Sequence, residues 1–140
     1  FSDLNLDNKR ELALLVWRPF KPWPVDRFLP SGGRITTFHD EDDRSCHLIL
    51  INVIDGSFRE IWAGSAMAAP IRSMVAADLD GDGRQELAAV EYPYNGKKRT
   101  GTLVVWRWNG FGFSLEARQA GTFSSLLATQ SGKKVLLLAQ

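Results

Sequence analysis

The chain has 140 residues, of which 44% are apolar and 24% charged, and its formal net charge is +1. This length suffices for one domain with a core of its own, and the balanced charge gives no indication of a nucleic-acid partner. The apolar runs are too short to cross a bilayer, no export signal is visible, and the single cysteine excludes an intramolecular disulfide.

The chain opens with a weak copy of a stretch that returns in its middle. Residues 3–13 align without a gap on residues 78–88, with Asp, Leu, Asp, Glu, Leu and Ala identical. Asn5 stands where the later copy has Asp80, and Asn8 stands where it has Gly83. The alignment indicates an internal repeat.

A strand is predicted over residues 11–17, and a proline-rich excursion follows over residues 18–44. The excursion is too apolar for a flexible linker, so we expect it to pack on the domain or on a partner. The aromatic residues assigned to partner binding are Phe20, Trp23 and Phe28.

Two β-hairpins of similar design are predicted. The first joins residues 46–53 to residues 58–62 through Asp55-Gly56, and the second joins residues 102–108 to residues 113–117 at Asn109-Gly110. Asp-Gly and Asn-Gly between apolar runs are strong hairpin signals.

The middle of the chain carries the strongest functional signal, an acidic loop between two short apolar runs. Ca²⁺ takes about six to eight oxygen ligands, and alternating acidic residues around a glycine turn can supply them. The crowded carboxylates would also repel one another without a cation. The predicted calcium ligands are the side chains of Asp78, Asp80, Asp82 and Glu86 and the carbonyl of Arg84.

An EF-hand is excluded because its loop needs a glutamate at the twelfth position, which is Ala89 here, and helices on both sides. An acidic turn without an ion stays as the alternative. The first copy can form a second, weaker site, since asparagine offers an oxygen ligand and tolerates the left-handed conformation of glycine. Its candidate ligands are Asp3, Asn5, Asp7 and Glu11.

A third copy without acidic residues begins near residue 122, so its turn is expected to hold no calcium. With the strands of one unit lettered a to d, the chain reads b-c-d, a-b-c-d, a-b. One β domain over residues 1–140 is therefore predicted to contain repeat 1 (about 1–70, with the insertion at 18–44), repeat 2 (about 71–120) and a partial repeat 3 (about 121–140).

This arrangement resembles the FG-GAP and VCBS repeats of integrin-like β-propellers. The residues that carry the resemblance are Ala77 to Gly83 with Glu86-Leu87, the weak copy at Asp3 to Leu12, and the hairpin at Trp106 to Gly110. The resemblance implies a Ca²⁺ ion that stiffens the edge of a blade, and an exported or cell-surface protein that serves adhesion, assembly or carbohydrate-associated roles.

About nine strands cannot close a propeller ring, which needs at least four blades of four strands. We expect an all-β fold of antiparallel blade-like repeats, either two to two-and-a-half blades packed side by side or a compact sandwich. Unpaired edges then need the excursion, further blades, other subunits or a protein partner to cover them.

Catalytic chemistry has little support in the sequence. Cys46 and His47 are neighbours on a predicted strand and point to opposite faces, so we expect a buried thiol beside a surface imidazole. His39 beside an acidic turn is interpreted as solvated surface. Trp106 and Trp108 share a strand face and can stack on a sugar, although core packing is the stronger interpretation.

The sequence therefore predicts a non-catalytic calcium-binding module for structural support or protein interaction, and the resemblance implies a location outside the cytoplasm. The alternative is a carbohydrate-binding or accessory domain of a larger secreted enzyme.

Overall fold

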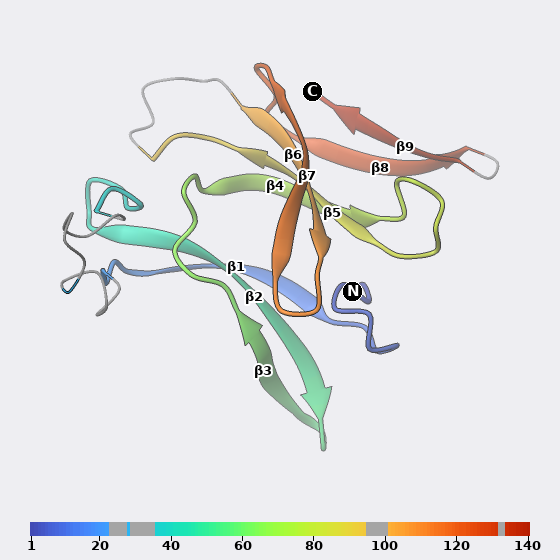
Figure 1. Ribbon diagram of the computed structural model, residues 1–140, viewed down its shortest axis with the longest axis horizontal. Helices are drawn as coiled ribbons and strands as arrows, with labels where there is room; N and C mark the ends of the chain where they lie inside the picture. The colour runs from blue at the N-terminus through green and yellow to red at the C-terminus, as the bar shows by residue number, and fades with distance from the viewer. Residues whose placement is uncertain (23–27, 29–35, 95–100, 132–133) are drawn as a thin grey trace.

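The computed structural model describes residues 1–22, 28, 36–94, 101–131 and 134–140. Within these residues the chain forms nine β-strands and no α-helix, which confirms the predicted all-β class (Figure 1). The strands are β1 (Leu12–Pro19), β2 (Arg44–Ile54), β3 (Ser57–Ala63), β4 (Ile71–Ala77), β5 (Glu86–Glu91), β6 (Thr102–Trp108), β7 (Phe113–Ala120), β8 (Leu126–Ser131) and β9 (Lys134–Ala139).

The strands form three antiparallel sheets, each built from a continuous region of the chain. Their orders are β1-β2-β3, β4-β5-β6-β7 and β8-β9. The three sheets pack face to face, as in the sandwich alternative, rather than side by side, and the last strand pair forms a separate sheet against the middle one.

The middle sheet is covered on both faces. One face, including Leu87 and Trp106, packs on Leu48 and Leu50 of the first sheet. The other face, including Val90, packs against the third sheet. Every residue of β5 is consequently buried. This double burial explains why β5 is a nearly continuous apolar run rather than an alternating one.

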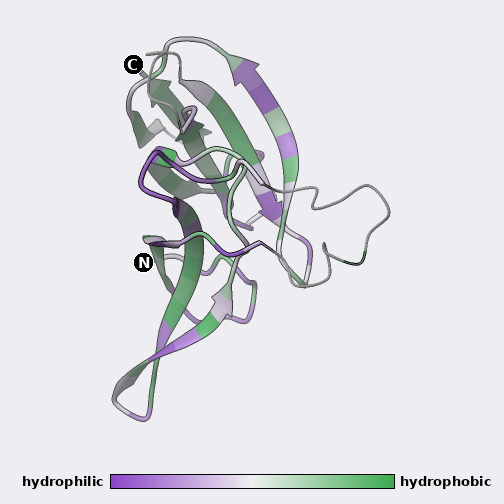
Figure 2. Ribbon diagram, turned by 90° about the vertical axis from the view of Figure 1, so that its left-hand side faces the viewer, coloured by the Kyte–Doolittle hydropathy of each residue, from purple (hydrophilic) through white to green (hydrophobic). Residues whose placement is uncertain are grey.

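Figure 2 shows hydrophobic residues concentrated along the stacked strands. The outward side of the third sheet is an exception, since Leu127, Leu136 and Leu138 are 64%, 45% and 55% exposed. In the part of the chain that is described, no helix has the length and apolar character to traverse a bilayer.

The turns follow their sequence signals in part. Asp55 and Gly56 both have positive φ, 52° and 71°, and they join β2 to β3 as predicted. The Asn109-Gly110 turn spans four residues instead, because the Asn109 side-chain oxygen accepts bonds from the amides of Phe111 and Gly112. The first strand also runs on through Pro19, which its edge position in the sheet permits.

A tyrosine ties the connection after β5 to the first sheet. The Tyr94 hydroxyl accepts a bond from the Cys46 amide (3.0 Å) and donates one to the Met67 carbonyl (2.9 Å). Burial raises the pKa of Tyr94 to about 12, so this hydroxyl stays protonated as a donor at neutral pH.

Candidate metal sites in two acidic loops

The second loop, residues 78–86, connects β4 to β5 at one end of the middle sheet. Ala77 pairs with Glu86 at its base, so the chain reverses between adjacent antiparallel strands. Gly81 and Gly83 have φ of 82° and 87°, a region that side chains other than glycine rarely adopt. The predicted placement of glycines at sharp turns is confirmed.

Carboxylate oxygens organise the backbone of the second loop. Asp78 accepts bonds from the amides of Gly81 (2.7 Å) and Gly83 (3.0 Å). Asp80 accepts from the Asp82 amide (3.1 Å), and Asp82 accepts from the Arg84 amide (2.8 Å). These side-chain turns hold the carboxylates on the inner side of the loop.

Three of the predicted ligands converge. Asp78, Asp80 and Glu86 each contribute one carboxylate oxygen, and these three oxygens lie within 4.8 Å of one another. Glu86 is almost fully buried and its Oε2 accepts a bond from the Leu79 amide (2.9 Å). Asp82 lies outside this trio but faces the same guanidinium, described next.

Arg107 of β6 places a positive charge among these carboxylates. Its Nη2 lies 3.0 Å from Glu86 Oε1 and contacts Asp80 Oδ2, and its Nη1 lies 3.8 Å from Asp82 Oδ2. The hydrogen bond from Arg107 lowers the pKa of Asp80, and the same contact raises the pKa of Arg107. The second loop thus contains a cation supplied by the protein itself.

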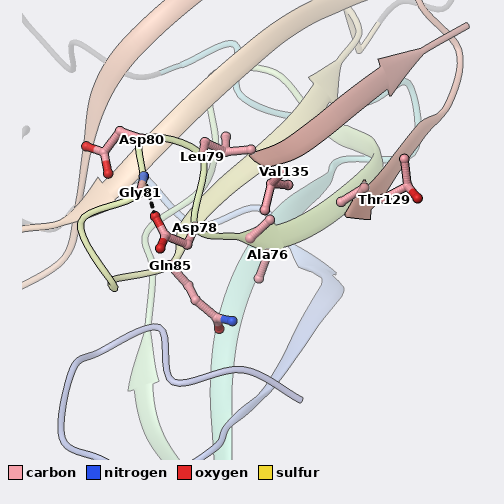
Figure 3. Close-up of a pocket in the computed structure, with 10 residues that line it drawn as sticks. Ala76, Asp78, Leu79, Asp80, Gly81, Gln85, Thr129 and Val135 are labelled. Atoms are coloured by element: carbon pink, nitrogen blue, oxygen red, sulfur yellow. Dashed lines mark hydrogen bonds between the residues drawn. The ribbon is translucent and has the colours of Figure 1, made fainter. Parts of the chain in front are cut away.

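A pocket of about 670 Å³ lies between the second loop and the β8-β9 pair. Figure 3 shows the Asp78 carboxylate turned toward the amide of Gly81, with Thr129 and Val135 across the pocket. The two loops themselves are neighbours, because Asp3 and Leu6 line a smaller pocket together with Gly83 and Arg84.

The first loop, residues 3–11, repeats the geometry of the second. Ser2 pairs with Glu11 as Ala77 pairs with Glu86. Leu6 and Asn8 have φ of 63° and 66°, at the positions of Gly81 and Gly83. The prediction that asparagine adopts the left-handed conformation here is confirmed.

Its hydrogen bonds also match. The Leu4 amide donates to Glu11 Oε2 (2.9 Å), and the Asn8 amide donates to Asp3 Oδ2 (3.0 Å), as their counterparts do in the second loop. Asn5 Oδ1 accepts from the Asp7 amide (3.2 Å). The converging trio is Asp3, Asp7 and Glu11, again within 4.8 Å.

Glu11 differs from Glu86 in what surrounds its second oxygen. The residue is fully buried, and within the described chain Oε1 has no hydrogen-bond partner. Burial raises the pKa of Glu11, the amides of Leu4 and Asn5 oppose this, and the charges of Asp7 and Asp3 add to it. The first loop therefore holds a buried carboxylate for which no described residue supplies a counter-charge.

The sequence reasoning missed Arg107. Leu87 pairs with Trp106, so Arg107 is the next residue along the strand and lies beside Glu86. In the first sheet Leu12 pairs with Ile51, which gives Asn52 the corresponding position. A charged residue between two tryptophans of a largely apolar strand was the available signal.

The cysteine and histidine side chains that were considered as catalytic candidates make structural contacts. Cys46 is buried, as predicted, and burial raises its pKa. His47 is half-buried rather than on the surface, because its ring bonds to the Gly64 carbonyl (3.0 Å) and the Ser45 hydroxyl (2.8 Å). The His39 ring bonds to the carbonyls of Asp40 and Thr36.

The aromatic residues of β6 belong to the core. Trp108, Phe113 and Trp62 stack edge to face with centroids 5.3–5.6 Å apart, and Trp106 packs on the same core between the first and middle sheets. This packing supports the core interpretation of these partly buried rings over stacking on a sugar.

Two of the three aromatics assigned to partner binding lie in the described chain. Phe20 is half-buried and packs on His39, with ring centroids 5.0 Å apart, so the two ends of the excursion contact each other. Phe28 is 72% exposed. Trp23 lies outside the described residues.

Comparisons of the chain with protein-family models, with characterised proteins and with solved structures found no match.

Proposed function

We propose that this chain is a non-catalytic calcium-binding module in which acidic loops clip the ends of antiparallel strand pairs. The observation that carries the proposal is the repetition of one loop design at two places 75 residues apart. In each loop, three carboxyl groups, one of them from a buried glutamate, converge within 4.8 Å.

The donor set fits Ca²⁺, which prefers several carboxylate and carbonyl oxygens in a flexible arrangement. The residues that would hold the ion in the second loop are Asp78, Asp80, Asp82, Glu86 and the carbonyl of Arg84, and those in the first loop are Asp3, Asn5, Asp7 and Glu11. The buried Oε1 of Glu11 supports the fit, because it is an acceptor that a cation would satisfy. Bound calcium would cross-link strand ends and stabilise the sheets.

A protein partner is the second part of the proposal. The middle sheet buries both faces, whereas the third sheet exposes Leu127, Leu136 and Leu138 on its outward face. A further sheet, from another subunit or from a partner protein, would cover this apolar face as the third sheet covers the middle one. Together with the FG-GAP and VCBS resemblance, these features favour an assembly role outside the cytoplasm, where calcium is abundant.

Thermal unfolding in the presence of calcium tests the central claim. Excess calcium should raise the melting temperature relative to excess chelator, since a ligand that binds only the folded state stabilises it. Magnesium at the same concentration is the control and should have a smaller effect, because it demands a tighter octahedral site. Identical melting in calcium and in chelator would contradict the proposal.

A further inference from the structure

We infer that Arg107 is the resident cation of the second loop, and that calcium therefore binds first at the first loop although that loop has fewer acidic side chains. This inference rests on the proposed function, because it assigns calcium to one of the two loops.

In the second loop, Arg107 competes with a metal ion for the carboxylates. One guanidinium faces three of the four acidic side chains, with Nη2 3.0 Å from the buried Glu86 Oε1 and Nη1 3.8 Å from Asp82. A calcium ion among the same oxygens would meet a positive charge only a few ångströms away. Repulsion between two such charges in a partly buried site opposes metal binding unless Arg107 moves away.

In the first loop no cation among the described residues competes for the corresponding oxygen. Asn52 occupies the position that Arg107 has in the middle sheet, and its side-chain oxygen accepts a bond from the Val53 amide. Within the described chain no ion pair reaches the loop, and Glu11 Oε1 is buried without a partner. A calcium ion would supply the missing counter-charge at no cost in existing contacts.

When Arg107 is included, the two loops have the same net charge. The larger number of acidic residues therefore gives the second loop no electrostatic advantage in binding calcium. Its four carboxylates and Arg107 sum to −4 + 1 = −3, and the three carboxylates of the first loop also sum to −3. Lys9, Arg10 and Arg84 are exposed, and no described ion pair joins them to these carboxylates. What then distinguishes the loops is the unpartnered buried carboxylate oxygen of Glu11, because the unpartnered buried oxygen of the second loop, Gln85 Oε1, belongs to an uncharged amide.

A matched pair of substitutions tests which loop binds first. Asp3 and Asp78 play the same role, each accepting two backbone amides, so Asp3→Asn and Asp78→Asn disturb the two loops alike. Calcium is titrated by calorimetry into the calcium-depleted full chain. We expect Asp3→Asn to weaken the tighter site by about tenfold or more and Asp78→Asn to leave it nearly unchanged. The reverse result would overturn the ranking.

A second pair tests the role of Arg107. Arg107→Gln should strengthen calcium binding at the second loop by about tenfold or more, and adding Asp78→Asn should abolish that gain. Arg118→Gln removes the same charge from a guanidinium that pairs with Glu91 at the opposite end of β5, and it should change neither site. Unchanged calcium binding in Arg107→Gln would overturn the role of Arg107.

The outcomes separate the inference from the proposed function. Calcium binding at the second loop alone would overturn the inference and leave the calcium module standing. If no variant shows binding heat or a calcium-dependent shift in melting temperature, both the inference and the proposed function are wrong. If Arg107→Gln does not fold by near-ultraviolet circular dichroism, the Asp3 and Asp78 variants still decide which loop binds first.

Discussion

The two acidic loops share a backbone and differ in their counter-charge. Both begin one residue beyond a paired position, use the same side-chain acceptors and bury a terminal glutamate. Among the described residues, only the second loop receives a guanidinium, and it comes from β6 rather than from the loop itself. The comparison teaches that the residue opposite the last ligand, on the neighbouring strand, sets the electrostatics of such a loop as much as the loop sequence does.

The largest effect is expected from Glu86→Gln, measured by chemical unfolding in excess chelator. The change removes a nearly buried ion pair with Arg107 but keeps an acceptor for the Leu79 amide. Hydrogen bonds to charged groups contribute about 1.5–3 kcal/mol, so we expect a loss of that size in the free energy of unfolding. Glu116→Gln on the exposed side of β7 is the control and should have little effect.

Glu11→Gln should have the opposite sign under the same conditions. It removes a buried charge without a described counter-charge and keeps the acceptor for the Leu4 amide, so in chelator we expect a gain of about 1 kcal/mol. In saturating calcium the order reverses, because the wild type gains about 2.7 kcal/mol at a hundredfold excess over Kd and the variant does not. A variant that is less stable than the wild type in chelator would contradict the difference between the loops.

Features that depend on neighbouring residues were predictable from the sequence, whereas features that depend on pairing between distant strands were not. The strand order, the acidic loops and the Asp55-Gly56 turn depend on neighbouring residues, and they were predictable. The position of Arg107 depends on the pairing of β5 with β6, and no local pattern determines it. From the sequence alone, the calcium affinities of the two loops can be ranked only by their numbers of acidic residues.

The stacking of sheets was also beyond local patterns. The β8-β9 pair resembles strands a and b of a repeat, but its inner face packs through Leu126 and Leu137 on the middle sheet. The continuous apolar runs of β8 and β9 give no sign of which face of the strand pair is covered. Only the packed structure distinguishes the buried Leu126 from the exposed Leu127.

Exchanging the turn residues of the loops tests whether their backbones are equivalent. Gly83 has φ of 87° in open space, and the matching Asn8 has φ of 66°. Gly83→Ala should cost about 1 kcal/mol, because alanine has no local hydrogen bond to offset the left-handed conformation, whereas Gly83→Asn should cost less. Equal losses of stability for the two variants, measured by thermal unfolding in chelator, would contradict the equivalence of the two loop backbones.

The smallest effect is expected at Glu91, a buried carboxylate at the other end of β5 that pairs with the half-exposed Arg118 at 2.9 Å. Burial raises its pKa and Arg118 lowers it less, so the folded state binds the proton more tightly than the unfolded state. Stability should then fall as pH rises from the unfolded pKa through the raised folded pKa, and Glu91→Gln should remove this component. Because Glu91 lies far along the strand from the acidic loops, the change should be the same in calcium and in chelator. A calcium-dependent change would mean that charges along the whole of β5 are coupled, and the contrast between the two loops would then no longer be a local property of Arg107.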